Sequence, residues 1–474
     1  MLHISDLHRT PGPHLSNDEL LSALISDANR WEAEAIPRPE LIVVSGDLVQ
    51  GAALDAHDPD AEIDAQYREV GAFLGQLSEE FLDSDRSRMV IVPGNHDVHW
   101  RRSLDGMKPI EPCPNGIATK CIQPTSDIRW NWDNRQAYEI SDHELYASRL
   151  DPFSRFRKAF YEGIEPDPFP CPDDDLLFFE YPELDLLIAG FSSWHGNDCF
   201  CHVGEIAPSS LASSQRLLAR SDMAIPIAVW HHSIQGGPRK RDYMDQRVVH
   251  RLIDFGFTVG LHGHQHHPGA APFELRLPNL TSMAVVGAGS LAVGDDELPM
   301  GERRQFNVVV IDPDNESITV HVRGMSSAGV FAGFHRDDFG GNTFVELKLP
   351  VVRTDGRGSR VLQQLDEAMT AIAERRYEDA LELSESIPTS QFPEKRRIAI
   401  EASRGLRRYA ALVELLSPPQ NASEAVELVS LLLDDGRFDD AKRRLQTSKS
   451  LLTPSMFREL QATVAVREMS DEFS

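Results

Sequence analysis

The chain has 474 residues, of which 41% are hydrophobic and 26% charged, and its formal net charge is −27. This length exceeds one typical core, so a large domain with a smaller one is expected. The acidic balance argues against broad electrostatic capture of DNA or RNA, because non-specific affinity depends on Lys and Arg neutralising phosphates.

The composition also bears on the compartment. No apolar run reaches the length of about 18 residues expected of a membrane helix, and the first polar motif begins at Asp6, which leaves no room for a signal peptide. The five cysteines are an odd number without disulfide spacing. We therefore expect a cytoplasmic protein with no membrane contact.

Strand and helix signals alternate in the first hundred residues. The expected elements are a strand at Leu2–Ser5, a helix opened by the capping box of Ser16 and Glu19, a strand at Leu41–Val44, a helix at Ile63–Phe81 and a strand at Met89–Val92. This alternation predicts an α/β fold in which the strand ends gather the functional loops.

The stretch over residues 98–180 is expected to be an insertion or cap. Val98–Ile140 is rich in Pro, Trp, Arg and Cys with little periodicity, whereas His143–Tyr161 has an apolar stripe typical of a helix. Regular structure then resumes. We expect strands at Leu186–Phe191, Ile225–Trp230, Thr258–Leu261, Ser282–Val286, Phe306–Ile311, Ser317–Val322 and Thr343–Leu349, with helices at Ser210–Ala219 and Met244–Phe255. The later strands would complete a second sheet.

The composition changes after residue 350. Residues 351–360 have the composition of a linker, and residues 361–474 are expected to form a separate all-α domain. Three similar stretches recur there around Tyr377, Tyr409 and Phe438, at spacings of 32 and 29 residues. These spacings are near the period of about 34 in tetratricopeptide arrays. A plain helical bundle explains the pattern equally well.

Five short polar motifs lie at the ends of expected strands. They are Asp6-Leu7-His8, Gly46-Asp47, Gly94-Asn95-His96-Asp97, His231-His232 and Gly263-His264-Gln265-His266. Together they supply carboxylate and amide oxygens mixed with imidazole nitrogens, the donor set that two neighbouring divalent cations prefer. Each motif alone is common in turns, so the weight lies in the ordered series.

This series resembles the calcineurin-like metallophosphoesterase family, whose pattern runs DxH, GD, GNH(D/E), H and GHxH in this order. The resemblance covers residues 1–350 and implies a sandwich of two mixed β-sheets flanked by helices. It also implies two divalent metal ions, with manganese favoured and iron, zinc or nickel compatible with the same ligands.

The resemblance implies a role for each motif residue. One ion would be held by Asp6, His8, Asp47 and His266, and the other by Asp47, Asn95, His231 and His264. Asp47 would bridge the two ions. His232 competes with His231 for one position, and Ser233 stands where family members usually have Pro, which leaves that choice open.

His96 follows a metal ligand and is the expected catalytic histidine, stabilising the phosphoryl group or protonating the leaving oxygen. Asp97 is expected to orient that imidazole by accepting its second N–H.

Three further features have weaker claims. Cys113, Cys121, Cys171, Cys199 and Cys201 are a zinc candidate in the insertion, although free buried thiols explain them more simply. Trp100, Arg101, Arg102, Trp130 and Trp132 are candidates for stacking on a base or packing the cap. Arg239, Lys240 and Arg241 are candidates for a phosphate contact or a solvated loop.

The expected activity is hydrolysis of a phosphodiester, in a nucleotide or nucleic acid, through a metal-bridging hydroxide. The segment after Gly46-Asp47 lacks the Arg that protein phosphatases of this family carry, and GNH followed by Asp is common among its phosphodiesterases and nucleases. Two alternatives stay open: a phosphomonoesterase, or a component of a complex that binds a protein partner through the C-terminal helices.

Overall fold

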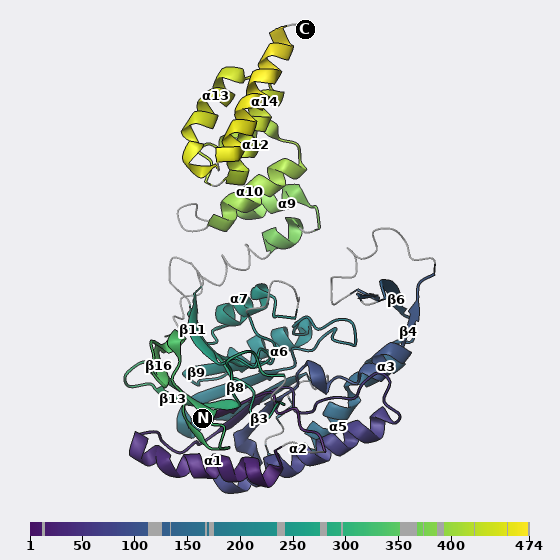
Figure 1. Ribbon diagram of the computed structural model, residues 1–474, viewed down its shortest axis with the longest axis vertical. Helices are drawn as coiled ribbons and strands as arrows, with labels where there is room; N and C mark the ends of the chain where they lie inside the picture. Colours follow the sequence, from purple (N-terminus) through teal and green to yellow (C-terminus); the bar gives the residue numbers. More distant parts are fainter. Residues whose placement is uncertain are drawn as a thin grey trace. The chain divides into compact units, whose positions relative to one another are not determined.

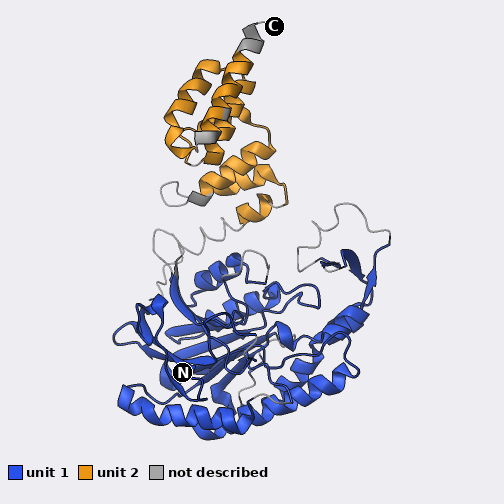
Figure 2. Cartoon of the chain, in the orientation of Figure 1, with its two compact units in different colours: residues 1–275, 281–354 blue, residues 276–280, 355–474 orange. Residues whose placement is uncertain are grey.

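The computed structural model describes residues 1–11, 15–111, 126–132, 134–165, 168–169, 175–234, 242–274, 282–294, 297–350, 367–372, 374–385, 393–420, 422–452 and 454–472. The chain divides into two compact units (Figure 2). Unit 1 comprises residues 1–275 and 281–354, and unit 2 comprises residues 276–280 and 355–474.

The first sheet of unit 1 has the strand order β15-β14-β13-β1-β2-β3, and β16 also pairs with β14. Its strands are β1 (Leu2–Ile4), β2 (Ile42–Ser45), β3 (Met89–Val92), β13 (Gln305–Asp312), β14 (Ser317–Met325), β15 (Phe331–Gly333) and β16 (Phe344–Lys348). The first three are parallel, whereas β13 runs antiparallel to β1. The carboxyl ends of β1, β2 and β3 therefore meet at one edge (Figure 1).

The second sheet has the order β11-β12-β10-β9-β8-β7. Its strands are β7 (Leu176–Tyr181), β8 (Leu186–Phe191), β9 (Ile225–Val229), β10 (Val259–His262), β11 (Gly269–Glu274) and β12 (Ser282–Gly287). Strands β8, β9, β10 and β12 are parallel, and β7 and β11 are antiparallel edges. Both sheets are mixed, as expected.

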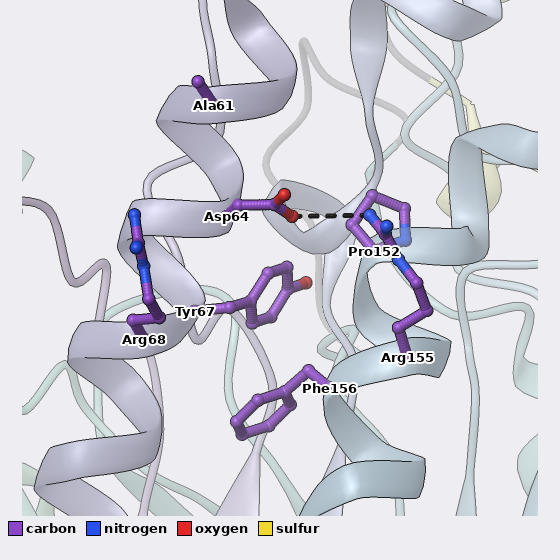
Figure 3. Close-up of a pocket in the computed structure, with 7 residues that line it drawn as sticks. All are labelled: Ala61, Asp64, Tyr67, Arg68, Pro152, Arg155 and Phe156. Atoms are coloured by element: carbon purple, nitrogen blue, oxygen red, sulfur yellow. Dashed lines mark hydrogen bonds and ion pairs between the residues drawn. The ribbon is translucent and has the colours of Figure 1, made fainter.

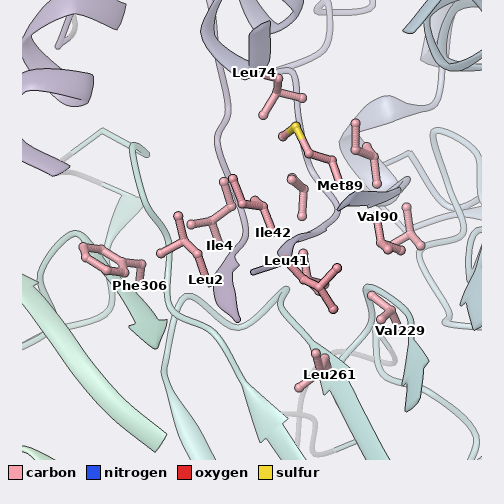
Figure 4. Packing of buried hydrophobic residues seen from close by; sticks show 14 of the residues in the cluster. Leu2, Ile4, Leu41, Ile42, Leu74, Met89, Val90, Val229, Leu261 and Phe306 are labelled. Carbon is pink, nitrogen blue, oxygen red and sulfur yellow. The ribbon is translucent and has the colours of Figure 1, made fainter. Parts of the chain in front are cut away.

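The core of unit 1 lies between these sheets. Ile42 and Val90 from the first sheet belong to one buried cluster with Val229 and Leu261 from the second (Figure 4). The sheets approach closely where Gly190 of β8 faces β3, since a Cβ there would lie 3.0 Å from Val92. These contacts confirm the predicted two-sheet sandwich.

Helices cover the sandwich. Those of unit 1 are α1 (Asn17–Trp31), α2 (Pro59–Leu82), α3 (Trp100–Asp105), α4 (His143–Ala147), α5 (Asp151–Phe160), α6 (Pro208–Leu218) and α7 (Gln246–Phe255). The capping box of Ser16 and Glu19 opens α1 as predicted. Helix α2 starts before the expected Ile63, because Asp58 caps it and Pro59 occupies its first turn.

The insertion contains more regular structure than its composition indicated. Strands β4 (Met107–Pro109), β5 (Ile128–Asn131) and β6 (Gln136–Ile140) form a three-stranded sheet in the order β4-β6-β5. The helix expected over 143–161 is divided into α4 and α5 by a 3₁₀ turn at Ser148–Leu150.

Unit 2 is helical, as predicted for the C-terminal region. Its helices are α9 (Tyr377–Glu385), α10 (Pro393–Gly405), α11 (Tyr409–Leu415), α12 (Ala422–Asp434), α13 (Phe438–Thr447) and α14 (Pro454–Glu472). The three similar stretches adopt the same turn: Arg375, Arg407 and Gly436 have φ of 61°, 57° and 71°. Helices α9, α11 and α13 start two residues later. Within the described ranges no helix has the length and apolarity needed to span a membrane.

Candidate metal centre

Parallel strand pairing brings the five motifs together. The loops after β1, β2 and β3 carry Asp6, Asp47 and Asn95, and the loops after β9 and β10 carry His231 and His264. Backbone hydrogen bonds join the first two loops, because the amide of Asp6 donates to Gly46 O at 3.0 Å and that of His8 to Asp47 O at 3.0 Å. Residues far apart in sequence thus line one site.

The first group of side chains surrounds Asp6. Its Oδ1 lies 3.3 Å from His266 Nε2 and 3.8 Å from His8 Nε2. Oδ2 accepts a hydrogen bond from the His264 amide at 3.0 Å, which ties the GHxH loop to the DxH loop. Asp6, His8 and His266 therefore form a compact triad of potential metal ligands.

The second group surrounds Asp47. Its Oδ2 lies 3.2 Å from His231 Nε2 and 3.7 Å from His8 Nε2. His231 Nε2 in turn lies 3.2 Å from Asn95 Oδ1 and 3.2 Å from His264 Nδ1. Asp47 belongs both to the triad with His231 and His264 and to one with His8 and His96, so one carboxylate links the two halves of the site.

Buried polar atoms without partners indicate that this site is made to hold cations. Asp6 Oδ1 and His8 Nε2 are buried, and neither has a hydrogen-bond partner among the described residues. Leaving such atoms unpaired costs roughly 1–3 kcal/mol each. Because hard oxygens and imidazole nitrogens converge within ligand distance of one another, the donor set fits divalent metal ions.

In the absence of metal, the charged groups of the site shift one another's pKa values. Burial raises the pKa of Asp47, but the charges of His231, His96 and His8 outweigh it and hold that pKa well below its usual value. Burial lowers the pKa of His231, yet Asp47 reverses the effect and raises it to about 9. A cation bound to His231 Nε2 must therefore displace a proton.

The backbone is strained where these ligands lie. Asp6, His8, Asp47, His264 and His266 have φ between 41° and 78°, in the left-handed region that non-glycine residues rarely adopt. Strain of this kind costs on the order of 1–3 kcal/mol per residue and concentrates at functional sites. This conformation directs several donor atoms toward the same point, at a cost in local backbone free energy.

Comparison with known proteins identifies the family. The family model that describes the calcineurin-like phosphoesterases matches residues 1–268 of this chain. The chain belongs to the calcineurin-like phosphoesterase family. Membership implies metal-dependent hydrolysis of a phosphoester, in a family that typically binds divalent metal ions.

Solved structures similar to this phosphoesterase have low sequence identity. YfkN from Bacillus subtilis, a calcineurin-like phosphoesterase, is 12% identical over 79% of this chain and 98% of that one, with a TM-score of 0.29. TT1561 of Thermus thermophilus is 12% identical over 68% of this chain and 92% of that one, with a TM-score of 0.27. Vps29 of Chaetomium thermophilum is 12% identical over 74% of this chain and 98% of that one, with a TM-score of 0.23. No curated protein matches the chain.

The two adjacent histidines of this phosphoesterase have different partners. His231 Nδ1 lies 2.8 Å from the carbonyl oxygen of Ser45, which leaves Nε2 facing Asp47 and Asn95. Both ring nitrogens of His232 are engaged by the protein, Nδ1 with Ser193 Oγ at 2.9 Å and Nε2 with Asn197 Oδ1 at 3.1 Å. This geometry favours His231 as the ligand.

His96 and Asp97 do not pair as expected. His96 Nδ1 lies 2.9 Å from the carbonyl oxygen of Gln50, so that carbonyl orients the ring. Asp97 accepts hydrogen bonds from the amides of Leu48 and Gly94 at 3.2 and 2.8 Å and from the Tyr67 hydroxyl at 3.0 Å. The structure therefore corrects the orienting role proposed for Asp97, which instead joins the GD and GNHD loops.

Gln50 is a site residue that the motifs did not reveal. Besides its carbonyl contact with His96, its Oε1 lies 3.1 Å from His8 Nδ1, which fixes the orientation of that ring. Its position three residues after Asp47 was the available signal, because a side chain so close to a ligand is confined to the same loop.

Among the weaker sequence candidates, Trp100 lies beside the centre, with its ring 5.7 Å from that of His96. The others lie apart from these ligands or outside the described residues. Cys199 and Cys201 are free thiols, and burial raises the pKa of Cys199 to about 12. Trp130 and Trp132 of the β5 region contact each other edge to face at 6.1 Å. Cys113, Cys121, Cys171, Arg239, Lys240 and Arg241 lie outside the described residues.

A separate cavity of about 560 Å³ lies between α2 and α5 (Figure 3). It is lined by Ala61, Asp64, Tyr67, Arg68, Pro152, Arg155 and Phe156, none of which is a candidate ligand. Tyr67 stacks on Phe156 at 5.1 Å, while its hydroxyl reaches Asp97. Tyr67 thus connects the wall of the cavity to Asp97, which joins the GD and GNHD loops.

Proposed function

We propose that this protein hydrolyses phosphodiesters with two divalent cations, manganese being the favoured metal. Asp6, His8, Asp47 and His266 would hold one ion, and Asp47, Asn95, His231 and His264 the other. The position of Asp47 between two triads carries this proposal, because a shared carboxylate reduces the repulsion between adjacent cations.

The bound ions would supply Lewis acidity at the phosphoryl oxygens and a lowered pKa for a water between them. The chain's own residues position the substrate around them. His96 is half-buried beside His8, with the two ring centres 4.6 Å apart, and with Nδ1 donating to Gln50 O its Nε2 can face a phosphoryl oxygen. His96 would then stabilise charge that develops on the phosphoryl group or assist the leaving oxygen.

A phosphodiester is favoured over a phosphomonoester by the Asp that follows Gly94-Asn95-His96 and by the absence of an Arg after Gly46-Asp47. A nucleotide is favoured over a long nucleic acid by the net charge of −27, which opposes binding of a polyanion away from the metals. A cytoplasmic setting fits the cysteine usage.

The test compares model substrates on the full chain loaded with manganese. Bis(p-nitrophenyl) phosphate and p-nitrophenyl phosphate are offered first, then cyclic nucleotides and single- and double-stranded DNA. The diester is expected to be cleaved faster than the monoester. Asp47→Ala is expected to abolish metal binding and hydrolysis, and His96→Ala to lower kcat by roughly 10²–10⁴-fold while the metals stay bound.

Exposed residues of the same types provide controls. Asp314→Ala and His143→Ala remove an exposed carboxylate and an exposed imidazole from unit 1, and both are expected to leave kcat unchanged. Hydrolysis that survives Asp47→Ala would refute the proposed centre, and a faster monoester reaction would refute the preference for diesters.

A further inference from the structure

A half-buried histidine outside the motifs lies at the end of a row of rings that begins at the metal centre. His8 contacts His96 at 4.6 Å between ring centres, His96 contacts Trp100 at 5.7 Å, and Trp100 contacts His202 edge to face at 5.6 Å. Among the described residues, neither ring nitrogen of His202 has a hydrogen-bond partner. A ring that served only for packing would not need those nitrogens.

The loop that carries His202, residues 194–205, is held firmly on both sides of it. The Asp198 carboxylate accepts hydrogen bonds from the amides of Phe200 and Cys201 at 2.8 and 3.0 Å. Asn197 Nδ2 donates to Val203 O at 2.6 Å. The main chain around His202 is therefore ordered by its neighbours, whereas the imidazole nitrogens form no hydrogen bond to any residue that the structure describes.

The insertion fixes this loop from outside. Arg129 of β5 forms an ion pair with Asp198, and both side chains are almost fully buried. The Tyr146 hydroxyl of α4 donates to the same Asp198 oxygen at 2.6 Å. Arg129 and Tyr146 act as positioning residues, because they hold the carboxylate that shapes the turn before His202.

The loop also lies directly on the metal-binding side. A Cβ at Gly204 would meet His232 Cβ at 2.5 Å, so this glycine allows the loop to pack against the strand end that carries His231. Burial lowers the pKa of His202; the charge of Asp198 opposes this, and those of His96 and His264 add to it. The neutral ring has one N–H donor and one acceptor nitrogen.

We propose that His202 is a specificity-determining residue that hydrogen-bonds a hydroxyl group on the organic part of the phosphodiester substrate. The proposal rests on the proposed function above. A hydroxyl is both donor and acceptor and so matches a neutral imidazole, whereas the phosphoryl oxygens are matched by the cations and His96. A site made to bind a hydroxyl discriminates against an analogue that lacks it, because its polar group is then left unpaired.

The test uses two substrates that differ only in hydroxyl groups, glyceryl p-nitrophenyl phosphate and propyl p-nitrophenyl phosphate. With manganese bound, the wild-type protein is expected to prefer the glyceryl ester by about tenfold in kcat/KM, the value of one well-placed hydrogen bond. His202→Phe keeps a ring against Trp100 but removes both nitrogens, and is expected to abolish the preference through a higher KM for the glyceryl ester. His202→Asn, which retains a donor and an acceptor, is expected to restore part of it.

Binding provides a readout that does not depend on turnover. Titration calorimetry with glycerol 3-phosphate and propyl phosphate should show tighter binding of the glycerol compound to wild-type protein and equal binding to His202→Phe. The metal content should be unchanged. His195→Phe is the matched control, because this histidine lies on the same loop but outside the row of rings. Burial lowers the pKa of His195, as it does for His202, and both preferences should persist in the variant.

The outcomes separate this proposal from the proposed function. An equal loss on both esters, or an unchanged preference in His202→Phe, overturns the role of His202 while hydrolysis itself stands. If wild-type protein cleaves neither ester, the proposed function fails, and equal calorimetric affinities of the two phosphates would then overturn the role of His202 as well.

Discussion

At the scale of single residues, the metal centre depends on histidines in which one ring nitrogen already contacts the protein, so that the other is free to bind metal. Ser45 O engages Nδ1 of His231, and Gln50 Oε1 engages Nδ1 of His8, so that each ring presents Nε2 to the centre. Such outer contacts fix the tautomer and orientation of a metal-binding imidazole. They explain why two adjacent histidines of the same strand end can have different roles.

The difference between His231 and His232 leads to a direct prediction. His231→Ala is expected to reduce bound manganese by about one ion per chain, because its Nε2 faces Asp47 and Asn95. His232→Ala is expected to retain both ions, since its nitrogens bind Ser193 and Asn197. Atomic emission spectrometry on the folded variants measures the difference. Loss of metal from His232→Ala alone would reverse the assignment.

The glycine of the GNHD motif is required for close approach. A Cβ at Gly94 would lie 2.1 Å from Asp47 Oδ1 and 2.5 Å from the Asp47 amide nitrogen. We expect Gly94→Ala to displace the Asp47 carboxylate, to lower the metal content and to reduce the free energy of unfolding by about 1–3 kcal/mol.

Gly75→Ala is the matched control for this substitution. Gly75 lies within α2, and a Cβ there meets no atom within 4 Å. This change should raise stability by roughly 0.5–1 kcal/mol, because alanine loses less backbone entropy in a helix. Denaturant unfolding and metal analysis of both variants test the pair. Normal metal content in Gly94→Ala would contradict the argument.

At the scale of elements, parallel strands bring the ligands together and buried charge joins the elements around them. Glu302, which precedes β13, accepts hydrogen bonds from Arg336 Nη1 at 3.1 Å and Gln305 Nε2 at 2.7 Å, and it lies 2.6 Å from His267 Nδ1. His267 follows β10 of the second sheet, so this cluster links a strand end of the first sheet to a strand end of the second. Its charge makes the link sensitive to pH.

The pH dependence of stability follows from Glu302. Burial raises the pKa of Glu302, but His267, Arg336 and Gln305 outweigh it and lower that pKa from 4.5 to about 2. A carboxyl with a lowered pKa adds stability that is fully present above its unfolded value and is lost as the pH falls through its folded value. The contribution should therefore disappear between about pH 4.5 and about pH 2.

Glu302→Gln isolates this contribution from those of other acids. The free energy of unfolding should differ between wild type and variant by about 1–2 kcal/mol at pH 6, since solvent screens part of the charge interaction, and the difference should shrink below pH 4. Urea titrations across this range measure it. A difference that stays constant with pH would show that the carboxylate charge is not the cause.

At the scale of the whole molecule, each unit has its own core. The large buried cluster of unit 1 draws on residues 2–349, and a separate cluster of unit 2 draws on residues 400–464. All candidate ligands, His96 and the 194–205 loop belong to unit 1. The helices of unit 2, with their recurring turns, remain a candidate for binding a protein partner.

The separate cores predict the effect of removing unit 2. A chain ending at residue 354 is expected to unfold cooperatively and to cleave a small diester with a kcat within about twofold of the full chain, because it keeps its own core. Circular dichroism and steady-state kinetics measure both. Unchanged kinetics with loss of a binding partner would support recruitment through unit 2, whereas an insoluble product would indicate that unit 2 is needed for packing.

Most of the sandwich could be predicted from local patterns. Buried runs such as Ile42–Ser45 and Met89–Val92 are apolar enough to mark central strands, and the Ser16 capping box marks the start of α1. The strands that escaped prediction are β4, β5, β6, β7, β11 and β15, which are short, lie at edges or belong to the small sheet of the insertion. Their pairing depends on distant partners rather than on their own periodicity.

The sequence by itself determined the donor set of the metal centre and the positions along the chain of the strands that carry it, because both follow from residue type and local hydrophobic pattern. Only the tertiary structure decided which atoms face one another. It placed Gln50 behind His8, separated His231 from His232, gave Asp97 new partners and set His202 against Trp100 at the end of the ring row. Side-chain contacts of this kind arise from packing between loops on different strands, so spacing along the chain can indicate the loop, as it does for Gln50, but not the partner atom.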